Sequence, residues 1–286
     1  METKLTIVTA AWNVIRNGNE SAFVRCLKSV QRLPFPHEHI IIDGGSDDGT
    51  VALIERISPE GKIVSEKDEG IYDALNKGLS MASGDYFYVM GTDDFIECPD
   101  ALEAALLKAR AGDLDMVISP VFSDTVDGRV LWPEKPKKLR RILFRMCYSH
   151  QGLLMKTAVA RKFGGFDLKY RIVADCKLAM KAMLGNASVA VSWRAYANFG
   201  QQGASSNSLL RKSEMIRLWG ELFNLDSYAA ELLENVGVMP LAKICKLLLS
   251  KSGTVRRAAF FMLKRKLMRQ RIGALKINSG NSEVIG

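Results

Sequence analysis

Short apolar runs alternate with segments of helical spacing along the first 120 residues of the chain. The runs are rich in β-branched and aromatic residues, as is typical of buried strands; they occupy residues 5–11, 40–42, 62–65, 86–90 and 116–119. The segments between them repeat apolar residues every three or four positions, as amphipathic helices do; they occupy residues 20–32, 50–57, 72–82 and 101–111. This alternation predicts an α/β fold with a mainly parallel, Rossmann-like central sheet and helices on both of its faces.

The pattern becomes less regular after Pro120. The residues that follow predict a hairpin around Asp127 and Gly128, and then a loop rich in proline and lysine. We expect the hairpin at 121–132, the loop at 133–138, strands at 152–155 and 188–193, a helix at 173–184 and a polar loop at 200–208. From Leu209 onward the chain is helical in character. The predicted organisation is one large domain, 1–205, with halves 1–119 and 120–205, and a helical extension, 206–286.

Polar residues follow four of the predicted strands at the point where each strand ends. They occupy residues 9–13, 43–46, 66–70 and 92–94. Because the carboxyl ends of parallel strands lie on the same side of a sheet, we expect these residues to line one edge. Ligands of α/β sheets bind in the crevice outside that edge. The sequence therefore predicts a binding cleft there.

Two adjacent carboxylates, Asp93 and Asp94, come shortly after the apolar run at 86–90. Burying a charge without a partner is unfavourable, so such a pair is either solvated in a turn or aimed at a cation. A hard divalent cation that holds a phosphate suits both the carboxylates and their place at the sheet edge. The pair alone leaves both interpretations open.

A predicted helix after Gly70 adds further polar groups next to this edge. Its residues Tyr72, Asp73, Asn76 and Lys77 are spaced to share one side of the helix. The alternative is an ordinary surface helix with an Asp73–Lys77 pair, which contributes little to stability.

The composition narrows the class of protein. With 48% hydrophobic and 25% charged residues among 286, the chain has the make-up of a soluble globular protein. A strand is predicted almost at the N-terminus, which leaves no room for a signal peptide, and no apolar run approaches the ~20 residues that span a bilayer. The five cysteines are scattered without zinc-site spacing, which favours reduced thiols in a cytoplasmic protein.

The net charge of +9 is concentrated in the C-terminal tail. Residues 241–286 contain eleven Lys and Arg and a single acid, Glu283, so the rest of the chain is close to neutral. On a helix these cations would flank apolar patches, which is typical of a segment lying on an anionic membrane, here residues 241–272. A helical subdomain packed on the body is the alternative. Nucleic-acid binding is disfavoured because aromatic residues are sparse and the body is not basic.

Four ordered motifs give the chain a family resemblance. They read IVT at 7–9, IDGGSDDGT at 42–50, SEKDEGIYDALNKG at 65–78 and ASGDY at 82–86. Together they resemble glycosyltransferase family 2, most of all its bacterial enzymes of exopolysaccharide assembly, including the colanic-acid type. The series covers about residues 4–95, with weaker matches to about 205. The resemblance implies a GT-A fold in which a UDP- or GDP-sugar lies across the predicted sheet edge.

The resemblance also implies which residues bind the donor. Asp43 would accept a hydrogen bond from the base while residues 9–13 wrap the nucleoside, although an aspartate also serves simply to begin the glycine turn. The implied set is Thr9, Ala10, Ala11, Asn13, Asp43, Glu66, Asp73, Lys77 and Thr92. The metal motif is incomplete, because Gly91 stands where the family often has an acid. We expect Asp93 to hold Mn²⁺ or Mg²⁺ at the diphosphate, with Asp94 as the second candidate ligand.

The segment 170–178 resembles the family's acid-bearing helix start, which makes Asp175 the candidate general base. A first-turn acid stabilised by the helix dipole is the alternative. His150 and Gln151 resemble a motif that lines the acceptor or diphosphate region. The implied reaction is a single displacement with inversion: a hydroxyl of a glycan or lipid-linked acceptor, deprotonated by Asp175, attacks the anomeric carbon as the nucleoside diphosphate leaves.

Two other functions stay open from the sequence. A catalytically inactive GT-A scaffold would tether a partner or a membrane through its basic tail, and Gly91 favours it slightly. A nucleotidyltransferase is disfavoured because the chain has no early glycine-rich loop with Arg or Lys for a triphosphate. The favoured interpretation is a cytoplasmic glycosyltransferase of cell-surface polysaccharide synthesis, peripheral at the inner leaflet of the plasma membrane.

Overall fold

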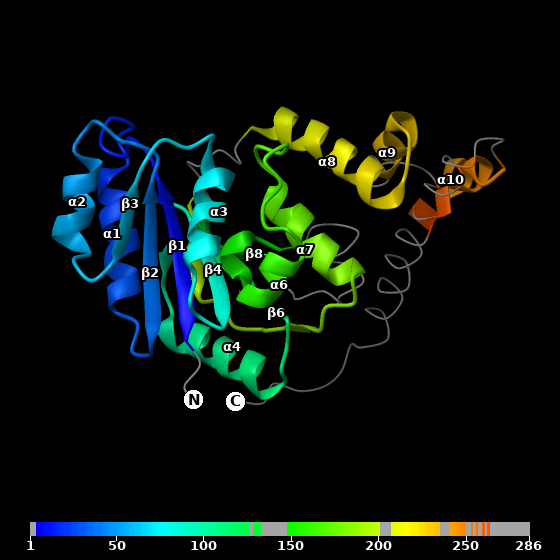
Figure 1. Ribbon diagram of the computed structural model, residues 1–286. Helices are drawn as coiled ribbons and strands as arrows, with labels where there is room; N and C mark the ends of the chain where they lie inside the picture. The colour runs from blue at the N-terminus through cyan, green and yellow to red at the C-terminus, as the bar shows by residue number, and fades with distance from the viewer. Residues whose placement is uncertain are drawn as a thin grey trace. The chain divides into compact units, whose positions relative to one another are not determined.

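A computed structural model describes residues 4–125, 128–132, 148–200, 207–234 and 241–249, together with Gly253, Arg256, 259–260 and 262–263. The chain divides into two compact units, Met1–Ser206 and Asn207–Gly286. The first unit carries both sheets, and Figure 1 labels many of its elements.

The first unit is built on a seven-stranded sheet. In spatial order its strands are β10 (Val189–Val191), β6 (Met116–Ile118), β9 (Leu153–Lys156), β4 (Tyr86–Met90), β1 (Leu5–Ala11), β2 (His37–Asp43) and β3 (Lys62–Ser65). The neighbours pair in parallel except at β9, which is antiparallel to both β4 and β6. The predicted mainly parallel sheet is confirmed.

Helices cover both faces of this sheet (Figure 1). One face packs against α1 (Glu20–Gln31), α2 (Thr50–Ile57) and α4 (Pro99–Ala111), whose apolar residues share one core cluster with alternate residues of β1 and β4. The other face packs against α3 (Ile71–Met81), α6 (Thr157–Lys162) and α7 (Ala174–Leu184). A Cβ at Gly78 of α3 would lie 2.4 Å from Val8, so this helix lies directly on β1.

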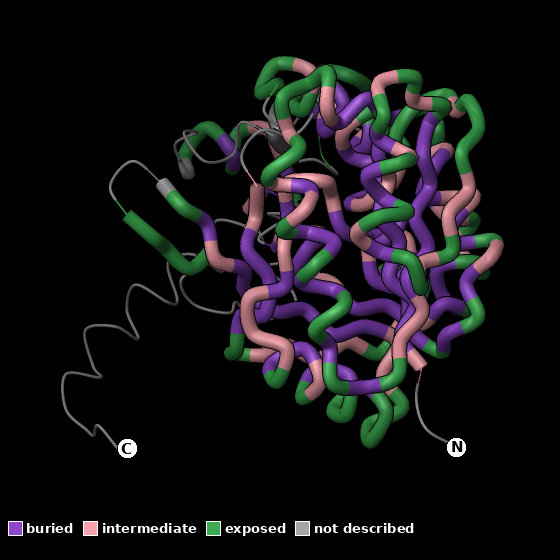
Figure 2. Tube along the Cα trace, turned by 90° about the vertical axis from the view of Figure 1, so that its left-hand side faces the viewer, coloured by how far each residue is buried: buried purple, intermediate pink, exposed green. Residues whose placement is uncertain are grey.

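Burial on both faces explains why the strands read as continuous apolar runs. Leu5, Ile7 and Val8 of β1 have no exposed surface, and neither have Ile40, Ile41 and Ile42 of β2. Figure 2 shows the buried residues gathered along the inner stretches of the trace and the exposed residues on its outer turns.

A second sheet was not predicted. Its four strands are, in order, β5 (Phe95–Ile96), β11 (Ala197–Phe199), β7 (Val121–Thr125) and β8 (Gly128–Trp132). The β7–β8 hairpin agrees with the prediction for 121–132, but β5 and β11 are too short to produce a sequence pattern. Strand β11 brings Gly200 beside the acid pair that follows β4, where Gly200 N donates to Asp94 Oδ1.

Helix α2 begins at the predicted residue. It follows Gly49, whose φ of +93° lies in the left-handed region that glycine adopts freely. Asp48 still contributes, because its Oδ1 accepts hydrogen bonds from the backbone N–H and hydroxyl of Thr50. The loop predicted at 133–138 lies outside the described residues, as does most of the one at 200–208.

The second unit is helical in its described part. It contains α8 (Ser208–Phe223), α9 (Ser227–Glu234) and α10 (Leu241–Leu247). Asn207 caps α8 by accepting a hydrogen bond from Leu210 N at 3.0 Å. None of the helices in the described ranges is both long and apolar enough to span a membrane. Most of the basic segment 241–272 lies outside the described residues.

Candidate functional site

The four predicted strand ends do lie at one edge of the main sheet. In the parallel register, Ala11 of β1 pairs with Asp43 of β2, and Asp43 with Ser65 of β3. On the other side, Thr9 pairs with Met90 of β4. The loops after these strands therefore share one edge.

Asp43 is buried and accepts the hydrogen bonds that hold the turn between β2 and α2. Its Oδ2 accepts hydrogen bonds from Ser46 N (2.8 Å), Gly45 N (3.1 Å) and Ser65 Oγ (2.7 Å), and its Oδ1 accepts one from Ser46 Oγ. The residue has no exposed surface. The carboxylate thus contacts protein groups that shape the edge, which matches the alternative interpretation of this residue.

Replacing Asp43 by asparagine is expected to destabilise the fold by about 3 kcal/mol, because an amide would turn an N–H₂ group toward donors that the carboxylate now satisfies. Urea unfolding followed by circular dichroism measures this loss. Asp47→Asn is the matched control in the same loop, because the Asp47 side chain is 72% exposed and pairs only with Arg16 in the described part of the chain. Equal stability of the two variants would contradict the organising role.

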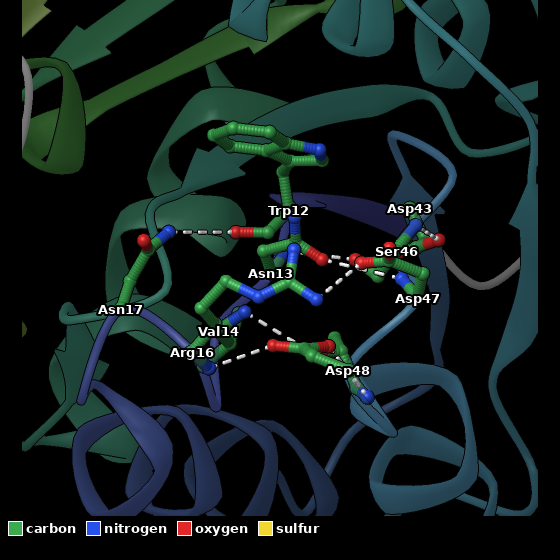
Figure 3. A network of polar contacts seen from close by, with 10 residues as sticks. Trp12, Asn13, Val14, Arg16, Asn17, Asp43, Ser46, Asp47 and Asp48 are labelled. Carbon is green, nitrogen blue, oxygen red and sulfur yellow. Dashed lines mark hydrogen bonds and ion pairs between the residues drawn. The ribbon is translucent and has the colours of Figure 1, made fainter.

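The β1–α1 and β2–α2 loops are joined by hydrogen bonds (Figure 3). The backbone N–H of Asn13 donates to Ser46 Oγ at 2.8 Å, and Asn13 Oδ1 accepts from Asp47 N at 3.2 Å. Asn13 has a φ of +44°, a conformation that asparagine tolerates better than most residues. This asparagine, expected to bind the donor, therefore also holds the two loops together.

Asp48 makes a second link between the same loops. Its Oδ2 accepts a hydrogen bond from Arg16 N at 2.7 Å, while Thr50 Oγ1 accepts one from Val14 N at 2.9 Å. Partial burial alone would raise the pKa of the Asp48 carboxyl, but the hydrogen bonds from Arg16 and Thr50 lower this pKa to about 2. The loops are consequently fixed together at neutral pH.

Trp12 is the aromatic side chain that the edge exposes. It is 60% exposed, whereas the neighbouring Thr9 and Ala11 are buried, with the Thr9 hydroxyl 3.1 Å from His39 Nε2. A Cβ at Gly44 would lie 2.7 Å from Asp68 Oδ2 and 3.2 Å from Trp12 Cδ1. Glycine at this position therefore allows the indole and the Asp68 carboxylate to approach the turn.

The polar residues of α3 face two different directions. Lys77 Nζ lies 2.9 Å from Glu66 Oε1 and 3.4 Å from Asp73 Oδ2, and it donates to the Lys67 carbonyl at 2.8 Å. The hydrogen bond to Glu66 is the largest cause of the raised pKa of Lys77. Glu66, Asp73 and Lys77 thus form one charged group beside the strand ends.

Tyr72 and Asn76 instead face the second half of the unit. The Tyr72 hydroxyl lies 3.0 Å from Asp175 Oδ1, and Asn76 Nδ2 donates to the Phe166 carbonyl at 2.8 Å. The four helix residues therefore meet two different sets of partners, one beside the strand ends and one in the second half of the unit.

Asp94 lies beneath the edge. It is 1% exposed, and its Oδ2 accepts a hydrogen bond from Gly91 N at 2.7 Å while its Oδ1 accepts one from Gly200 N at 2.9 Å. Gln151 Nε2 donates to both oxygens at 2.9–3.0 Å. Burial raises the pKa of Asp94 above its usual range, although the nearby His150 and these donors oppose the shift. Asp94 is thus surrounded by protein donors. Gln151, which we expected near the acceptor, is 2% exposed and contacts Asp94 instead.

Asp93 is partly exposed beside Thr92 at the end of β4. A Cβ at Gly200 would lie 2.2 Å from Asp93 Cγ, so the chain after β11 passes directly against this side chain. Sequence reasoning missed Gly200, because no local pattern marks it. Only glycine fits there without displacing Asp93.

The acid pair fits a metal site in which the substrate supplies part of the ligands. Within the described ranges, no group of three or more His, Cys, Asp or Glu side chains is placed to hold a metal ion. Mg²⁺ and similar ions, however, are commonly held by one or two carboxylates together with substrate phosphates and water. Asp93 therefore fits a metal that arrives with a diphosphate, and the chain offers no all-protein cage in the part that the structure describes.

Asp175 and His150 come together from distant parts of the chain. Asp175 lies in the first turn of α7, and its Oδ2 is 3.3 Å from Nδ1 of His150, which begins the short 3₁₀ turn His150–Gly152. His150 Nε2 lies 3.8 Å from Asp94 Oδ2. Burial opposes the charged imidazole, but the hydrogen bond and charge of Asp175, with the charges of Asp94 and Asp93, raise the pKa of His150. The histidine thus links the candidate base to the acid pair.

A small apolar cavity adjoins this pair on the α7 face of the sheet. Its apolar lining comes from β4, β9, α7 and the loop before α7: Phe87, Val89, Leu153, Met155, Phe166 and Leu178. Asp175 and His150 complete its wall, and their side chains are 21% and 29% exposed. Both groups are therefore shielded from bulk water on one side and accessible on the other.

Comparison with known proteins identifies sequence relatives. The family model described as Glycosyl transferase family 2 matches residues 6–167. A glycosyltransferase of Mycobacterium tuberculosis, described as uncharacterized, is 32% identical over 193 residues, which are 63% of this chain and 69% of that protein. A PGL/p-HBAD biosynthesis glycosyltransferase of Mycobacterium bovis is 28% identical over 202 residues, which are 68% of this chain and 77% of that protein.

Solved structures share the fold. S. aureus TarS 1–349 in complex with UDP-GlcNAc superposes with a TM-score of 0.63 at 16% identity, over 94% of this chain and 92% of that one. A mannosyltransferase of Pyrobaculum calidifontis in complex with GDP-Man and Mn²⁺ superposes with a TM-score of 0.61 at 14% identity, over 96% and 88%. Both similarities lie at the level of the GT-A fold.

Proposed function

The chain belongs to glycosyltransferase family 2, and from this premise we propose that it transfers a sugar from a nucleoside-diphosphate sugar to a hydroxyl of an acceptor. The observation that carries the proposal is the common edge of β1, β2, β3 and β4, with Asp175 and His150 close to the acid pair at its end. A nucleotide bound along that edge would direct its sugar toward Asp175.

We place the nucleoside on the loops after β1 and β2. The exposed Trp12 offers an aromatic face on which a base can stack, and Ala10 and Asn13 flank it. Asp43 acts from below by fixing the turn of Gly45 and Ser46. Glu66, Asp73, Lys77 and Thr92 border the remainder of the edge.

The transfer step is an inverting displacement. A bond forms between the acceptor oxygen and the anomeric carbon while the bond from that carbon to the diphosphate oxygen breaks. The electron pair leaves with the nucleoside diphosphate, and Asp175 takes the proton of the acceptor hydroxyl. The apolar side chains that line the cavity beside Asp175 shield one side of the base from water.

A divalent ion, Mn²⁺ or Mg²⁺, would be held by Asp93 together with the diphosphate of the donor. When bound, such an ion offsets the charge that develops on the leaving phosphate. Asp94, held by Gln151 and the backbone of Gly91 and Gly200, orients the turn that carries Asp93. In this proposal Asp94 is a positioning residue, and the metal contact falls to Asp93.

The acceptor is proposed to be a glycan or a lipid-linked sugar in the assembly of a cell-surface polysaccharide. One relative is named a PGL/p-HBAD biosynthesis glycosyltransferase. The basic residues of 241–272 would hold the enzyme at an anionic membrane where a lipid-linked acceptor resides. The acceptor class and the membrane contact both rest on these two arguments.

Nucleotide binding is testable without knowledge of the acceptor. UDP or GDP with Mn²⁺ is expected to raise the melting temperature, and Trp12→Ala is expected to weaken the binding of that nucleotide about tenfold or more because a stacking contact is lost. The matched control is Trp193→Ala, because Trp193 is also exposed, at 72%. It follows β10, which is the last strand at the end of the sheet opposite β2 and β3.

A panel of sugar nucleotides then separates the possible functions. Release of nucleoside diphosphate, by transfer or slow hydrolysis, supports a glycosyltransferase. Release of pyrophosphate would instead indicate a nucleotidyltransferase. Nucleotide binding without any turnover, across the panel and with glycan acceptors, would indicate an inactive scaffold.

A further inference from the structure

The hydroxyl of Tyr72 lies close to two hydrogen-bond acceptors beside the candidate base. It is 2.7 Å from the carbonyl oxygen of Ile172 and 3.0 Å from Asp175 Oδ1. A phenol has one proton to donate and lone pairs that accept. The hydroxyl therefore has one proton to donate and two acceptors within hydrogen-bond distance.

The ring that carries this hydroxyl is fixed in place. Tyr72 is 8% exposed and stacks on Phe166, with ring centroids 5.5 Å apart and planes 17° from parallel. Asn76 in turn holds Phe166 by two backbone hydrogen bonds, from its Nδ2 to the Phe166 carbonyl and from Phe166 N to its Oδ1, both 2.8 Å. The choice between the two acceptors is thus made by rotation about the C–O bond, with no movement of the ring.

This geometry suits a carboxyl group that changes its protonation state in every turnover. As a carboxylate, Asp175 requires donors, and the Tyr72 hydroxyl supplies one at Oδ1. With a proton on Oδ1, the carboxylic acid itself becomes a donor. The Tyr72 oxygen accepts from it while the phenol proton turns to the Ile172 carbonyl. Every proton shared by Tyr72 and Asp175 therefore has an acceptor, whether Asp175 is ionised or protonated.

We propose that Tyr72 is a positioning residue that serves Asp175 in both protonation states, donating to the carboxylate and accepting from the acid. The proposal rests on the proposed function, in which Asp175 is the general base. Tyr72 belongs to α3 in the first half of the fold, whereas Asp175 belongs to α7 in the second half. Tyr72 thereby connects the helix that carries Asp73 and Lys77 to the base.

Among the described residues, three ionisable side chains face Asp175. Tyr148 and His150 approach it from the segment before β9, and Tyr72 approaches from α3. Burial, and then the charge of Asp175, raise the pKa of Tyr72 well above its usual value, so the phenol keeps its proton. Tyr72 therefore acts through hydrogen bonding and does not compete with Asp175 for the acceptor's proton.

The test is Tyr72→Phe, which removes the hydroxyl and keeps the stacked ring. We expect kcat to fall about 10- to 100-fold, as for a lost hydrogen bond to a charged group, with an unchanged KM for the donor. We also expect the acidic limb of the kcat–pH profile to move to higher pH, because a carboxylate that loses a donor holds its proton more tightly. A purely structural role would lower the melting temperature or raise KM without moving the profile.

The matched control is Tyr86→Phe, which removes a hydroxyl that donates to the Leu114 carbonyl at 2.9 Å. This variant is expected to keep the wild-type kcat and pH profile. If Tyr72→Phe also keeps both while Asp175→Asn is inactive, the positioning role is overturned and the proposed function stands. If Asp175→Asn is fully active, the proposed base and the role of Tyr72 both fail.

A fluorinated tyrosine at position 72 provides a variant that keeps both ring and hydroxyl and so does not depend on the folding of Tyr72→Phe. Fluorine makes the phenol a stronger donor, so the acidic limb of the profile is expected to move to lower pH, opposite to the shift in Tyr72→Phe. A profile that does not move with the fluorinated residue overturns the proposal.

Discussion

Replacement of Asp175 by asparagine is expected to lower kcat for sugar transfer about a thousandfold, which is within the usual range for loss of a general base. Asparagine has nearly the same volume, and its carbonyl oxygen can still accept from Tyr72. Its amide then faces Nδ1 of His150, which can accept once the charge of Asp175 no longer favours the imidazolium. An amide does not take the acceptor's proton at neutral pH. Initial rates at saturating donor and acceptor measure kcat, and calorimetry with the donor alone is expected to show unchanged affinity.

Asp113→Asn is the matched control for this variant. The Asp113 side chain is 94% exposed in the loop after α4, where it pairs with Lys156. Its replacement is expected to leave kcat unchanged. A wild-type kcat in Asp175→Asn, combined with a lower melting temperature, would instead assign Asp175 to the alternative role of a first-turn acid that stabilises α7 through the helix dipole.

The main sheet was predictable because its inner strands are buried on both faces. The structure places β4 and β1 at the predicted residues 86–90 and 5–11. A doubly buried strand is made mainly of apolar residues, so it stands out in the sequence. The edge strand β3 is only partly buried, but it too lies at the predicted residues, 62–65. The second sheet escaped prediction because β5 and β11 have only two and three residues and exist through their pairing with distant partners.

The sequence predicted which edge of the sheet carries the site, but it did not predict the direction in which each side chain points. Parallel topology alone brings the four strand ends together, whereas the direction of each carboxylate depends on distant donors. Asp94 faces inward because Gln151 and Gly200, far along the chain, donate to it. On α3, a rotation of ~100° per residue places Tyr72 and Asn76 on one face and Asp73 and Lys77 on the next. Nothing local decides which face meets which partner.

The replacement of Asp93 by asparagine is expected to abolish the metal-dependent part of nucleotide binding and to lower kcat about a thousandfold, because the ion supplies several kcal/mol of charge stabilisation to the departing diphosphate. Calorimetric titration of UDP or GDP with and without Mn²⁺ measures the first effect. In the wild type, Mn²⁺ alone is expected to bind weakly, since the described residues offer no group of three ligands. Tight binding of Mn²⁺ without nucleotide would contradict a metal held jointly with the diphosphate.

Asp85→Asn is the matched control, because Asp85 precedes the opposite end of the same strand and accepts a hydrogen bond from Lys4 N there. It is expected to retain metal-dependent binding.

Gly200→Ala gives an independent test of the site that keeps both carboxylates. The added methyl group would lie 2.2 Å from Asp93 Cγ and would have to displace that side chain. If Asp93 holds the metal, Gly200→Ala is therefore expected to weaken Mn²⁺-dependent nucleotide binding although every ligand is present. If nucleotide binding in Gly200→Ala keeps its full Mn²⁺ dependence, the position of Asp93 is not what the metal requires, and the acid pair serves the fold through Asp94 alone.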